Sequence, residues 1–318
     1  MKPSVWLKKR SYHFRDFSAI EELVRAKKNQ QLSISLCIPT FNEEKTIRGV
    51  IECYQERLIK EYPLLDEIVV IDGRSRDRTI AIVEELGVPY YFDDYPLSEE
   101  MEKVTGKGEA LWKSLYFASG DLIIWSDSDI KNPDPRFAYG ILGPLLQNEE
   151  INFVKACYRR PLQLGDEIKG DQGGRVTELV VKPMLSLFFP PLRVISQPLS
   201  GEYGGRREVL EKIPFSTGYG VESGLLIDIF QRYGLESIAQ VDLEERIHEN
   251  QDLSSLKKMS FCILQRIFSR LEEYEQLELK EKLGKELASI KDNSLQEEEL
   301  IERERPPMEQ LPIYRDKF

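Results

Sequence analysis

The stretch IIWSDSDI, residues 123–130, decides the fold. It begins as a nearly continuous apolar run and ends in two carboxylates, Asp127 and Asp129, separated by one serine. Such a run is typical of a strand buried between two helical layers. Burying unpaired charge is costly, so the strand should end at a place that needs negative charge. Side chains two residues apart in an extended chain leave on the same side, and both carboxylates can therefore reach one cation.

The cation that suits this pair is Mg²⁺ or Mn²⁺. Both ions accept carboxylate oxygen and keep open positions for the phosphates of a substrate. The alternative is a strand-ending turn in which the aspartates only accept hydrogen bonds from backbone amides. An isolated Asp-x-Asp favours the turn, but the strand before it and polar clusters elsewhere in the sequence favour the metal.

Strands and helices alternate over the first 130 residues. Strands are expected at 33–39, 66–72, 88–92 and 121–126, with helices between them. This alternation indicates an α/β fold with a Rossmann-like, mostly parallel sheet flanked by helices, in which ligands collect beyond the carboxyl ends of the strands. Four polar clusters lie there: PTFNEE, DGRS, the GKG loop and DSD.

The chain divides into four parts. Residues 1–30 form an N-terminal arm, 31–150 an α/β half, 151–255 a glycine-rich half that supplies the second-substrate pocket, and 256–318 a helical C-terminal extension. Two stripes at helical spacing support this extension. They are Ile263, Ile267, Leu271 and Tyr274, then Leu283, Leu287 and Ile290. An amphipathic extension of this kind favours self-association, and we expect a homodimer.

Charge and hydropathy exclude several classes of partner. The 318 residues carry 44 Lys and Arg against 55 Asp and Glu, a formal net charge of -11, so a general attraction to nucleic acid or anionic lipid is not expected. The longest apolar stretch, residues 184–195, is too short and too interrupted by proline to span a bilayer. We expect a soluble, cytoplasmic protein that binds anions through local basic groups.

Several other residues are candidates for anion or metal binding. Arg246, His248 and Asn250 alternate in RIHEN and would share one side of an extended chain. Lys107 lies between two glycines before a helix, where backbone amides can help its ammonium to hold a phosphate. The alternatives are a structural histidine and a solvated loop lysine. The GxxxxGK[ST] spacing of a Walker P-loop is absent.

The second half of the chain contributes weaker candidates. Arg175 and Thr177 in GGRVTE could bind a phosphate or carboxylate, although the motif taken by itself favours a surface turn. Glu222 in GYGVE could bind sugar hydroxyls or simply favour a helix N-terminus. Asp72 could accept a hydrogen bond from a base or ribose, or cap a turn.

Three motifs together resemble the GT-A nucleotide-sugar glycosyltransferases over about residues 33–129: CIPTFNEEKTI, VVIDGRSRDRT and the strand-terminal DSD. A narrower resemblance, to the glucosyl-3-phosphoglycerate synthases, rests on GKGEALW, GGRVTELVVKP, PLSGEYGGRRE, GYGVE and RIHEN. These are retaining enzymes that move glucose from a nucleotide diphosphate sugar to the 2-hydroxyl of 3-phosphoglycerate. One departure is Arg74 in DGRS, where related transferases have a smaller turn.

The resemblance implies roles by position. The donor nucleotide sugar would be bound by Pro39, Thr40, Phe41, Asn42, Glu43, Asp72, Ser75, Lys107 and Asp127. The acceptor would be bound by Gly174, Arg175, Thr177 and Asn250. Asp129 and His248 would ligate the metal, Mg²⁺ or Mn²⁺. The catalytic group would be Asp127, Asp129, Glu222 and Arg246, with Glu222 on the glucose and Arg246 on the diphosphate.

The chemistry implied is the transfer of glucose from UDP-glucose or GDP-glucose. The metal and cationic side chains would stabilise charge on the departing diphosphate, and the leaving phosphate would help to take the proton of the acceptor. Such a product belongs to glucosylglycerate or compatible-solute synthesis. Two alternatives stay open: a GT-A transferase that acts on a polyprenyl phosphate, and a sugar-nucleotide sensor without catalysis.

Overall fold

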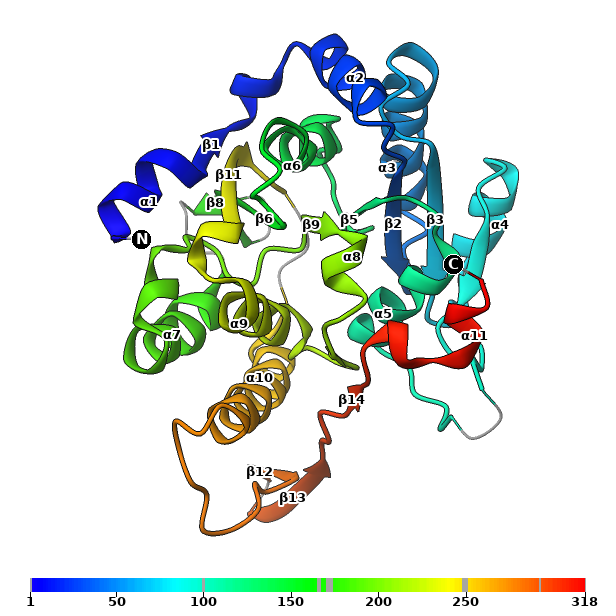
Figure 1. The fold of residues 1–318 in the computed structure, drawn as a ribbon. Helices are drawn as coiled ribbons and strands as arrows, with labels where there is room; N and C mark the ends of the chain where they lie inside the picture. The colour runs from blue at the N-terminus through cyan, green and yellow to red at the C-terminus, as the bar shows by residue number, and fades with distance from the viewer. Residues whose placement is uncertain are drawn as a thin grey trace.

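A computed structural model describes residues 2–98, 101–164, 167–169, 174–247, 251–291 and 293–317. Its centre is an eight-stranded sheet with the order β1-β11-β6-β9-β5-β2-β3-β4 (Figure 1). The strands, in that order, are Ser11–His13, Ile238–Glu245, Phe153–Arg159, Tyr203–Arg206, Leu122–Trp125, Ile34–Thr40, Glu67–Asp72 and Tyr90–Phe92. Within the described sheet, β9 pairs antiparallel with β5 and β6, and the other neighbours are parallel. The predicted mostly parallel, Rossmann-like sheet is confirmed.

The sheet is buried on both faces. Successive side chains of a strand point to opposite faces, and in β5 Ile123 and Trp125 enter one apolar core while Leu122 and Ile124 enter the other. This double burial explains why β5 is apolar without interruption. Polar residues can begin only where the strand leaves the two cores, at Ser126.

Helices cover both faces of the sheet (Figure 1). Residues of α2, α3, α4 and α6 share one core, and residues of α5, α7, α9 and α10 share the other. Their bounds are α2 Ile20–Asn29, α3 Ile47–Tyr54, α4 Thr79–Glu85, α6 Arg136–Gln147, α5 Lys107–Phe117, α7 Lys182–Phe188, α9 Val221–Tyr233 and α10 Leu253–Glu273. The other α-helices are α1 Pro3–Arg10, α8 Arg207–Leu210 and α11 Pro312–Arg315.

The carboxyl ends of three parallel strands meet at one edge of the sheet. β2 ends at Thr40, β3 at Asp72 and β5 at Trp125, and their registers pair Thr40 with Asp72 and Cys37 with Trp125. The polar clusters PTFNEE, DGRS and DSD therefore begin side by side, as the parallel arrangement predicts.

The N-terminal residues are joined to the far edge of the sheet. β1 pairs in parallel with β11, and the fully buried Trp6 of α1 donates its Nε1 hydrogen to the carbonyls of Leu235, at 2.9 Å, and Ile238, at 3.0 Å. The first helix thus closes the end of the apolar core beside β11.

The C-terminal extension is only partly helical. The stripe from Ile263 to Leu271 lies on α10 and is buried, as predicted. The helix predicted from Leu283, Leu287 and Ile290 is wrong, because β12 Glu286–Lys291 and β13 Ser294–Glu299 form an antiparallel hairpin there. Asn293 has a φ of 58° in the turn, a conformation that asparagine tolerates better than most residues.

The hairpin projects from the body, and the chain then returns to it (Figure 1). On the return, β14 Glu304–Arg305 pairs antiparallel with β10 Phe215–Ser216. A small hairpin of β7 Leu162–Leu164 and β8 Glu167–Lys169 lies after β6.

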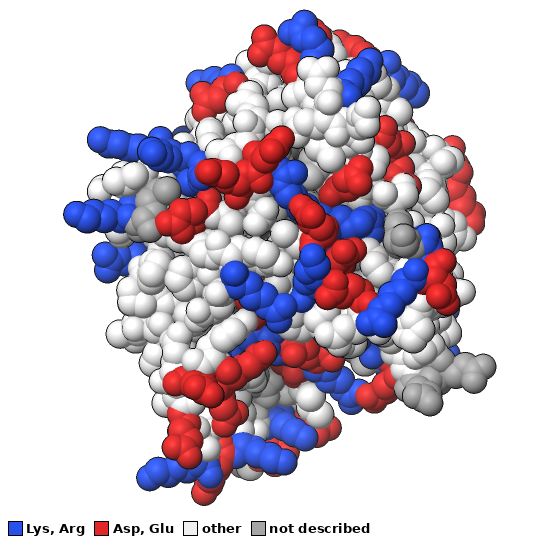
Figure 2. Space-filling model, in the orientation of Figure 1, with Lys and Arg blue, Asp and Glu red and all other residues white. Residues whose placement is uncertain are grey.

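Figure 2 shows acidic and basic side chains interspersed over the face it presents, with no broad area of one sign. Within the described ranges, no helix combines the length and the apolar character that a membrane crossing requires.

Replacement of Trp6 by alanine is expected to lower the free energy of unfolding by about 3–5 kcal/mol, because it empties a buried site and leaves two carbonyls without their donor. Urea denaturation of the whole chain measures this. Leu7→Ala is the control, since Leu7 is 46% exposed on the same helix, and its effect should stay below about 0.5 kcal/mol. Equal effects of the two substitutions would contradict the anchoring role of Trp6.

Candidate functional site

A cavity of about 690 Å³ opens at the carboxyl ends of β2 and β5. Both halves of the chain line it. The predicted site residues on its walls are Pro39, Thr40, Phe41, Glu43, Lys107, Asp127, Asp129, Gly174, Arg175, Thr177, Glu222 and Arg246. The sequence prediction therefore converges on one cavity, although its residues come from distant segments.

Three predicted donor-binding residues, Asn42, Asp72 and Ser75, do not line the cavity. Ser75 donates its hydroxyl hydrogen to Asp72 at 2.5 Å, and the Ser75 oxygen accepts from the amide of Asn42 at 2.7 Å. Burial raises the pKa of Asp72, and the hydrogen bonds from Ser75 oppose that rise. These contacts join the loops after β2 and β3, and direct contact of the three residues with a nucleotide stays a prediction.

The other two predicted residues, His248 and Asn250, lie outside the described residues. β11 ends at Glu245, and Arg246 follows it with its side chain buried. The predicted metal and acceptor roles of His248 and Asn250 stay predictions.

Lys107 is the first residue of α5, and the glycines beside it allow that helix to begin against the loop that precedes α9. A Cβ added at Gly108 would lie 1.9 Å from the carbonyl oxygen of Ser216, and one at Gly106 would lie 2.7 Å from that of Thr217. Any larger residue would push the two segments apart. The GKG motif thus brings Lys107 close to Glu222.

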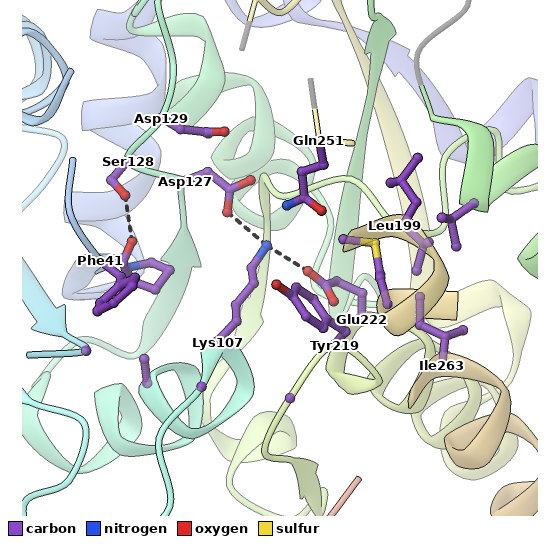
Figure 3. Close-up of a pocket in the computed structure, with 18 of the residues that line it drawn as sticks. Phe41, Lys107, Asp127, Ser128, Asp129, Leu199, Tyr219, Glu222, Gln251 and Ile263 are labelled. Atoms are coloured by element: carbon purple, nitrogen blue, oxygen red, sulfur yellow. Dashed lines mark hydrogen bonds and ion pairs between the residues drawn. The ribbon is translucent and has the colours of Figure 1, made fainter. Parts of the chain in front are cut away.

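Lys107 lies between two carboxylates (Figure 3). Its Nζ is 2.9 Å from Asp127 Oδ1 and 2.8 Å from Glu222 Oε1. Burial acts to lower the pKa of Lys107, but the charges of Asp127 and Glu222 outweigh it and hold that pKa well above its usual range. The lysine is therefore a permanent cation that joins the end of β5 to the start of α9.

Arg246 is the second cation of the site. Its Nη2 is 2.9 Å from Asp127 Oδ2 and 2.6 Å from Asp129 Oδ1, and its Nε is 3.2 Å from Glu202 Oε1. Burial acts to raise the pKa of Asp127, but Lys107 and Arg246 hold it below its usual range. Asp127 is thus ionised and shared by both cations.

The carboxylates of this site fit a divalent cation. Among the described residues, the ion pairs join four carboxylates, Asp127, Asp129, Glu202 and Glu222, to Lys107 and Arg246. When ionised, these groups carry two more negative than positive charges. Asp127 and Asp129 converge on one guanidinium nitrogen, and Asp129 is 32% exposed. No cluster of three or more His, Cys, Asp or Glu ligands occurs within the described ranges, and the predicted ligand His248 lies outside them.

The opposite wall carries groups suited to a second anion. Gly174, at a φ of 75°, precedes Arg175, whose Nη2 donates to the carbonyl of Gln251 at 2.7 Å, and Thr177 is buried beside them. Arg160 lines the same cavity and donates to the Leu199 carbonyl at 3.2 Å. Two guanidinium groups from the second half of the chain therefore line the cavity.

The remaining wall is apolar. It is formed by Leu199, Val176 and the α10 residues Leu256, Met259 and Ile263. In Figure 3, Leu199 and Ile263 lie across the cavity from Phe41, beyond Glu222. An apolar wall beside these partly buried ion pairs lowers the local dielectric and strengthens their electrostatic effect.

Sequence reasoning missed Glu202, Arg160 and Tyr219. Glu202 lies in SGEYGG with its side chain fully buried, and burial raises its pKa against the influence of Arg246. A charged residue inside a glycine-rich stretch was the available signal for Glu202. Tyr219 lies inside the GYGVE motif, which was the available signal for it. Arg160 lies in a segment without a distinctive pattern, and only the tertiary structure brings it to the cavity.

Comparison with known proteins gives consistent matches. The family model Glycosyl transferase family 2 matches residues 35–213. The chain is 49% identical over 314 residues to the glucosyl-3-phosphoglycerate synthase of Petrotoga mobilis, covering 98% of this chain and 96% of that protein.

Two solved structures are similar over nearly the whole chain. The mannosyl-3-phosphoglycerate synthase of Rubrobacter xylanophilus has a TM-score of 0.88 at 36% identity, covering 97% of this chain and 99% of the other. The glucosyl-3-phosphoglycerate synthase of Mycobacterium tuberculosis, in complex with Mn²⁺, UDP and glucosyl-3-phosphoglycerate, has a TM-score of 0.80 at 39% identity, covering 92% and 95%.

Replacement of Arg246 by methionine is expected to lower the free energy of unfolding by about 3 kcal/mol, because Glu202 is left buried without its cation. Adding Glu202→Gln should recover at least about 1 kcal/mol of this, since the uncompensated charge is removed. Urea denaturation of the single and double variants measures both effects. The control is Arg175→Met, on the more exposed wall, with an effect below about 0.5 kcal/mol. A double variant no more stable than Arg246→Met would show that Glu202 is not the group Arg246 compensates.

Proposed function

This chain belongs to the glucosyl-3-phosphoglycerate synthases of glycosyl transferase family 2, and on that premise we propose that it moves glucose from UDP-glucose to the 2-hydroxyl of 3-phosphoglycerate with retained configuration. It is a GT-A, metal-dependent hexosyltransferase. The observation that supports the assignment best is the joining of Lys107 and Arg246 through Asp127 at the edge of the sheet. That arrangement places two fixed cations beside a carboxylate pair, as release of a diphosphate requires.

The donor is proposed to lie along the wall formed by the loop after β2. Pro39, Thr40, Phe41 and Glu43 line that wall, and the half-exposed ring of Phe41 offers a surface against which a base can stack. Lys107 and Arg246 would then face the diphosphate. Both cations are already fixed by ion pairs, so they can stabilise developing charge with little reorganisation.

The divalent cation would be held by Asp129 and, by family resemblance, His248, with Asp127 beside them. When bound, it supplies Lewis-acid stabilisation of charge on the departing diphosphate. The family member from Mycobacterium tuberculosis was solved with Mn²⁺ and UDP. Asp129 suits this role because it keeps an exposed carboxylate while it contacts Arg246.

The acceptor is proposed to lie against Arg175, Thr177 and Gly174, and Arg160 also lines this cavity. Guanidinium groups bind carboxylates and phosphates through paired hydrogen bonds, and 3-phosphoglycerate carries one of each. Glu222 would hold the glucose between the diphosphate of the donor and the acceptor. The chain's contribution is therefore to hold two anionic substrates in register, which lowers the entropic barrier to transfer.

Two further donors and an alternative acceptor class are proposals to be tested in the same assay. GDP-glucose is the second donor predicted from the sequence. GDP-mannose is the third, because a mannosyl-3-phosphoglycerate synthase shares this fold. Polyprenyl phosphate is the alternative acceptor, and transfer without lipid argues against it. A cytoplasmic location and a role in glucosylglycerate synthesis stay predictions.

The decisive assay measures UDP release from UDP-glucose with Mn²⁺ or Mg²⁺, with and without 3-phosphoglycerate, and identifies the product by mass. Release that requires both metal and acceptor, with one hexose added, is expected. Asp129→Ala should lower kcat/KM by about 100-fold and raise the metal concentration needed for half-maximal rate. Asp134→Ala is the matched control, because Asp134 lies later in the same loop between β5 and α6, pairs with Arg136 and does not line the cavity.

Two outcomes would contradict this proposal. Binding of nucleotide sugar without acceptor-dependent release would favour a sensor without catalysis. Unchanged activity of Asp129→Ala at limiting metal would remove Asp129 from the ligand set.

A homodimer is proposed to form through the β12–β13 hairpin. Ile290 and Leu295 are cross-strand partners, 79% and 64% exposed, and together form an apolar spot near its tip. Sedimentation equilibrium should give twice the chain mass for the wild type, and Ile290→Asp with Leu295→Asp should shift it toward the monomer. The control Glu297→Gln, on the same exposed strand, should leave it unchanged. A wild-type monomer, or a dimer insensitive to both aspartates, would contradict this interface.

A further inference from the structure

The chain end returns from the hairpin to support the loop before α9. β14 pairs with β10, and the amide of Thr217 donates to the carbonyl of Arg303 at 3.0 Å. Residues 303–305 therefore run beside residues 215–217, with β14 as the paired part of this segment. In Figure 1, β14 leads from the hairpin back into the body of the protein.

Glu302 is the residue of this returning segment that reaches the loop with its side chain. Its Oε1 accepts hydrogen bonds from the amides of Gly218 and Gly220, each at 3.0 Å. A Cβ added at Gly218 would lie 2.7 Å from Oε2. The carboxylate thus packs directly against glycine backbone and fixes both amides of the turn.

That turn carries the residues facing the sugar side of the cavity. Gly218 and Tyr219 line the cavity, and Glu222 follows in the first turn of α9. Glu222 is in turn 2.8 Å from Lys107. A shift of the turn would therefore move Tyr219 and Glu222, and with them one of the two partners of Lys107.

The same segment also holds the helix that begins with Lys107. The carbonyl of Thr217 accepts from the amide of Glu109, at 2.9 Å, and Arg305 Nε lies 2.8 Å from Glu109 Oε2. Strand β14 therefore contacts both elements that carry the glucose-side residues. Glu302 binds the amide of Gly220, which is only two residues before Glu222.

The surroundings of Glu302 show that its carboxylate is placed there at a cost. Burial raises its pKa to about 7, against the hydrogen bonds from Gly220 and Gly218 and the charge of Arg266 on α10. The backbone of Glu302 is held independently, since its amide donates to Gln265 Oε1 at 3.2 Å. The side chain of Glu302 can therefore be replaced while its backbone keeps the hydrogen bond to Gln265.

We propose that Glu302 is a positioning residue for the donor sugar: through the amides of Gly218 and Gly220 it sets Tyr219 and Glu222 against the glucose. This inference rests on the proposed function, because it acts through the glucose-binding role of Glu222. Glu302 itself does not line the cavity. The reaction thus depends on a segment that follows the hairpin at the end of the chain.

The test compares two substitutions of similar size. Glu302→Gln keeps a carbonyl oxygen where Oε1 lies, and Glu302→Leu keeps the volume without any acceptor. Affinities for UDP and UDP-glucose, measured by titration calorimetry with Mn²⁺, separate the nucleotide from the sugar. Glu302→Leu should bind UDP within about twofold of wild type but lose about tenfold in UDP-glucose affinity and in kcat/KM, because two buried amides lose their acceptor. Glu302→Gln should restore both values to near wild type.

The matched control is Glu304→Gln. Glu304 lies in the same returning segment, two residues after Glu302, and pairs with Arg266 and with Arg270, the latter at 2.5 Å. It makes no side-chain contact with the loop amides among the described hydrogen bonds. Its loss should lower the thermal midpoint and leave the ratio of UDP to UDP-glucose affinity unchanged. A merely structural role for Glu302 predicts the same result as this control.

Hydrogen exchange separates failure of this inference from failure of the proposed function. The amides of Gly218 and Gly220 should exchange slowly in wild type and Glu302→Gln and at least about tenfold faster in Glu302→Leu. If wild type transfers no glucose, the proposed function fails, and the exchange rates still decide whether Glu302 fixes the loop. Should Glu302→Leu not fold, Glu302→Ala is measured in the same way, with a smaller effect in the same direction. Equal weakening of UDP and UDP-glucose, or unchanged exchange in a folded variant, would overturn the inference.

Discussion

The shared ion pairing of Asp127 with Lys107 and Arg246 is the constraint on which the rest of the site depends. Its two oxygens contact different cations, each 2.9 Å away. One cation begins α5 and the other follows β11, so a single carboxylate at the end of β5 joins three elements. Removing either cation would leave the Asp127 carboxylate with part of its charge uncompensated, which would destabilise its ionised form.

The sheet makes this convergence possible. Parallel strands bring their carboxyl ends to one edge, and the double burial of β5 leaves its first polar residues at that edge. The antiparallel β9 then extends the sheet between β5 and β6, which brings Glu202 beneath Arg246. The second half of the chain thereby becomes a wall of the same cavity.

The two walls differ in the way they hold charge. On the proposed donor side, cations are fixed by carboxylates before any ligand arrives, so their fields are oriented in advance. On the proposed acceptor side, the Arg175 guanidinium donates to a backbone carbonyl and has no carboxylate partner among the described ion pairs. Cations that are already fixed suit a donor whose leaving group develops negative charge. A guanidinium without a carboxylate partner suits a small anion that must enter and leave.

The sequence by itself determined the alternating α/β order, the parallel sheet and the polar clusters at its edge, because apolar periodicity and strand ends are local properties. It also located Lys107, Asp127, Asp129, Glu222 and Arg246, through motifs that resemble a family. It failed at residues 283–290, where the apolar spacing predicted a helix but pairing with β13 across the hairpin turn makes residues 286–291 a strand.

Only the tertiary structure decided which groups compensate one another. Glu202 under Arg246 and Glu302 under the Gly218–Gly220 turn are joined by contacts between segments far apart in the chain. No local pattern records such contacts, because the free energy of a buried charge depends on what folds against it.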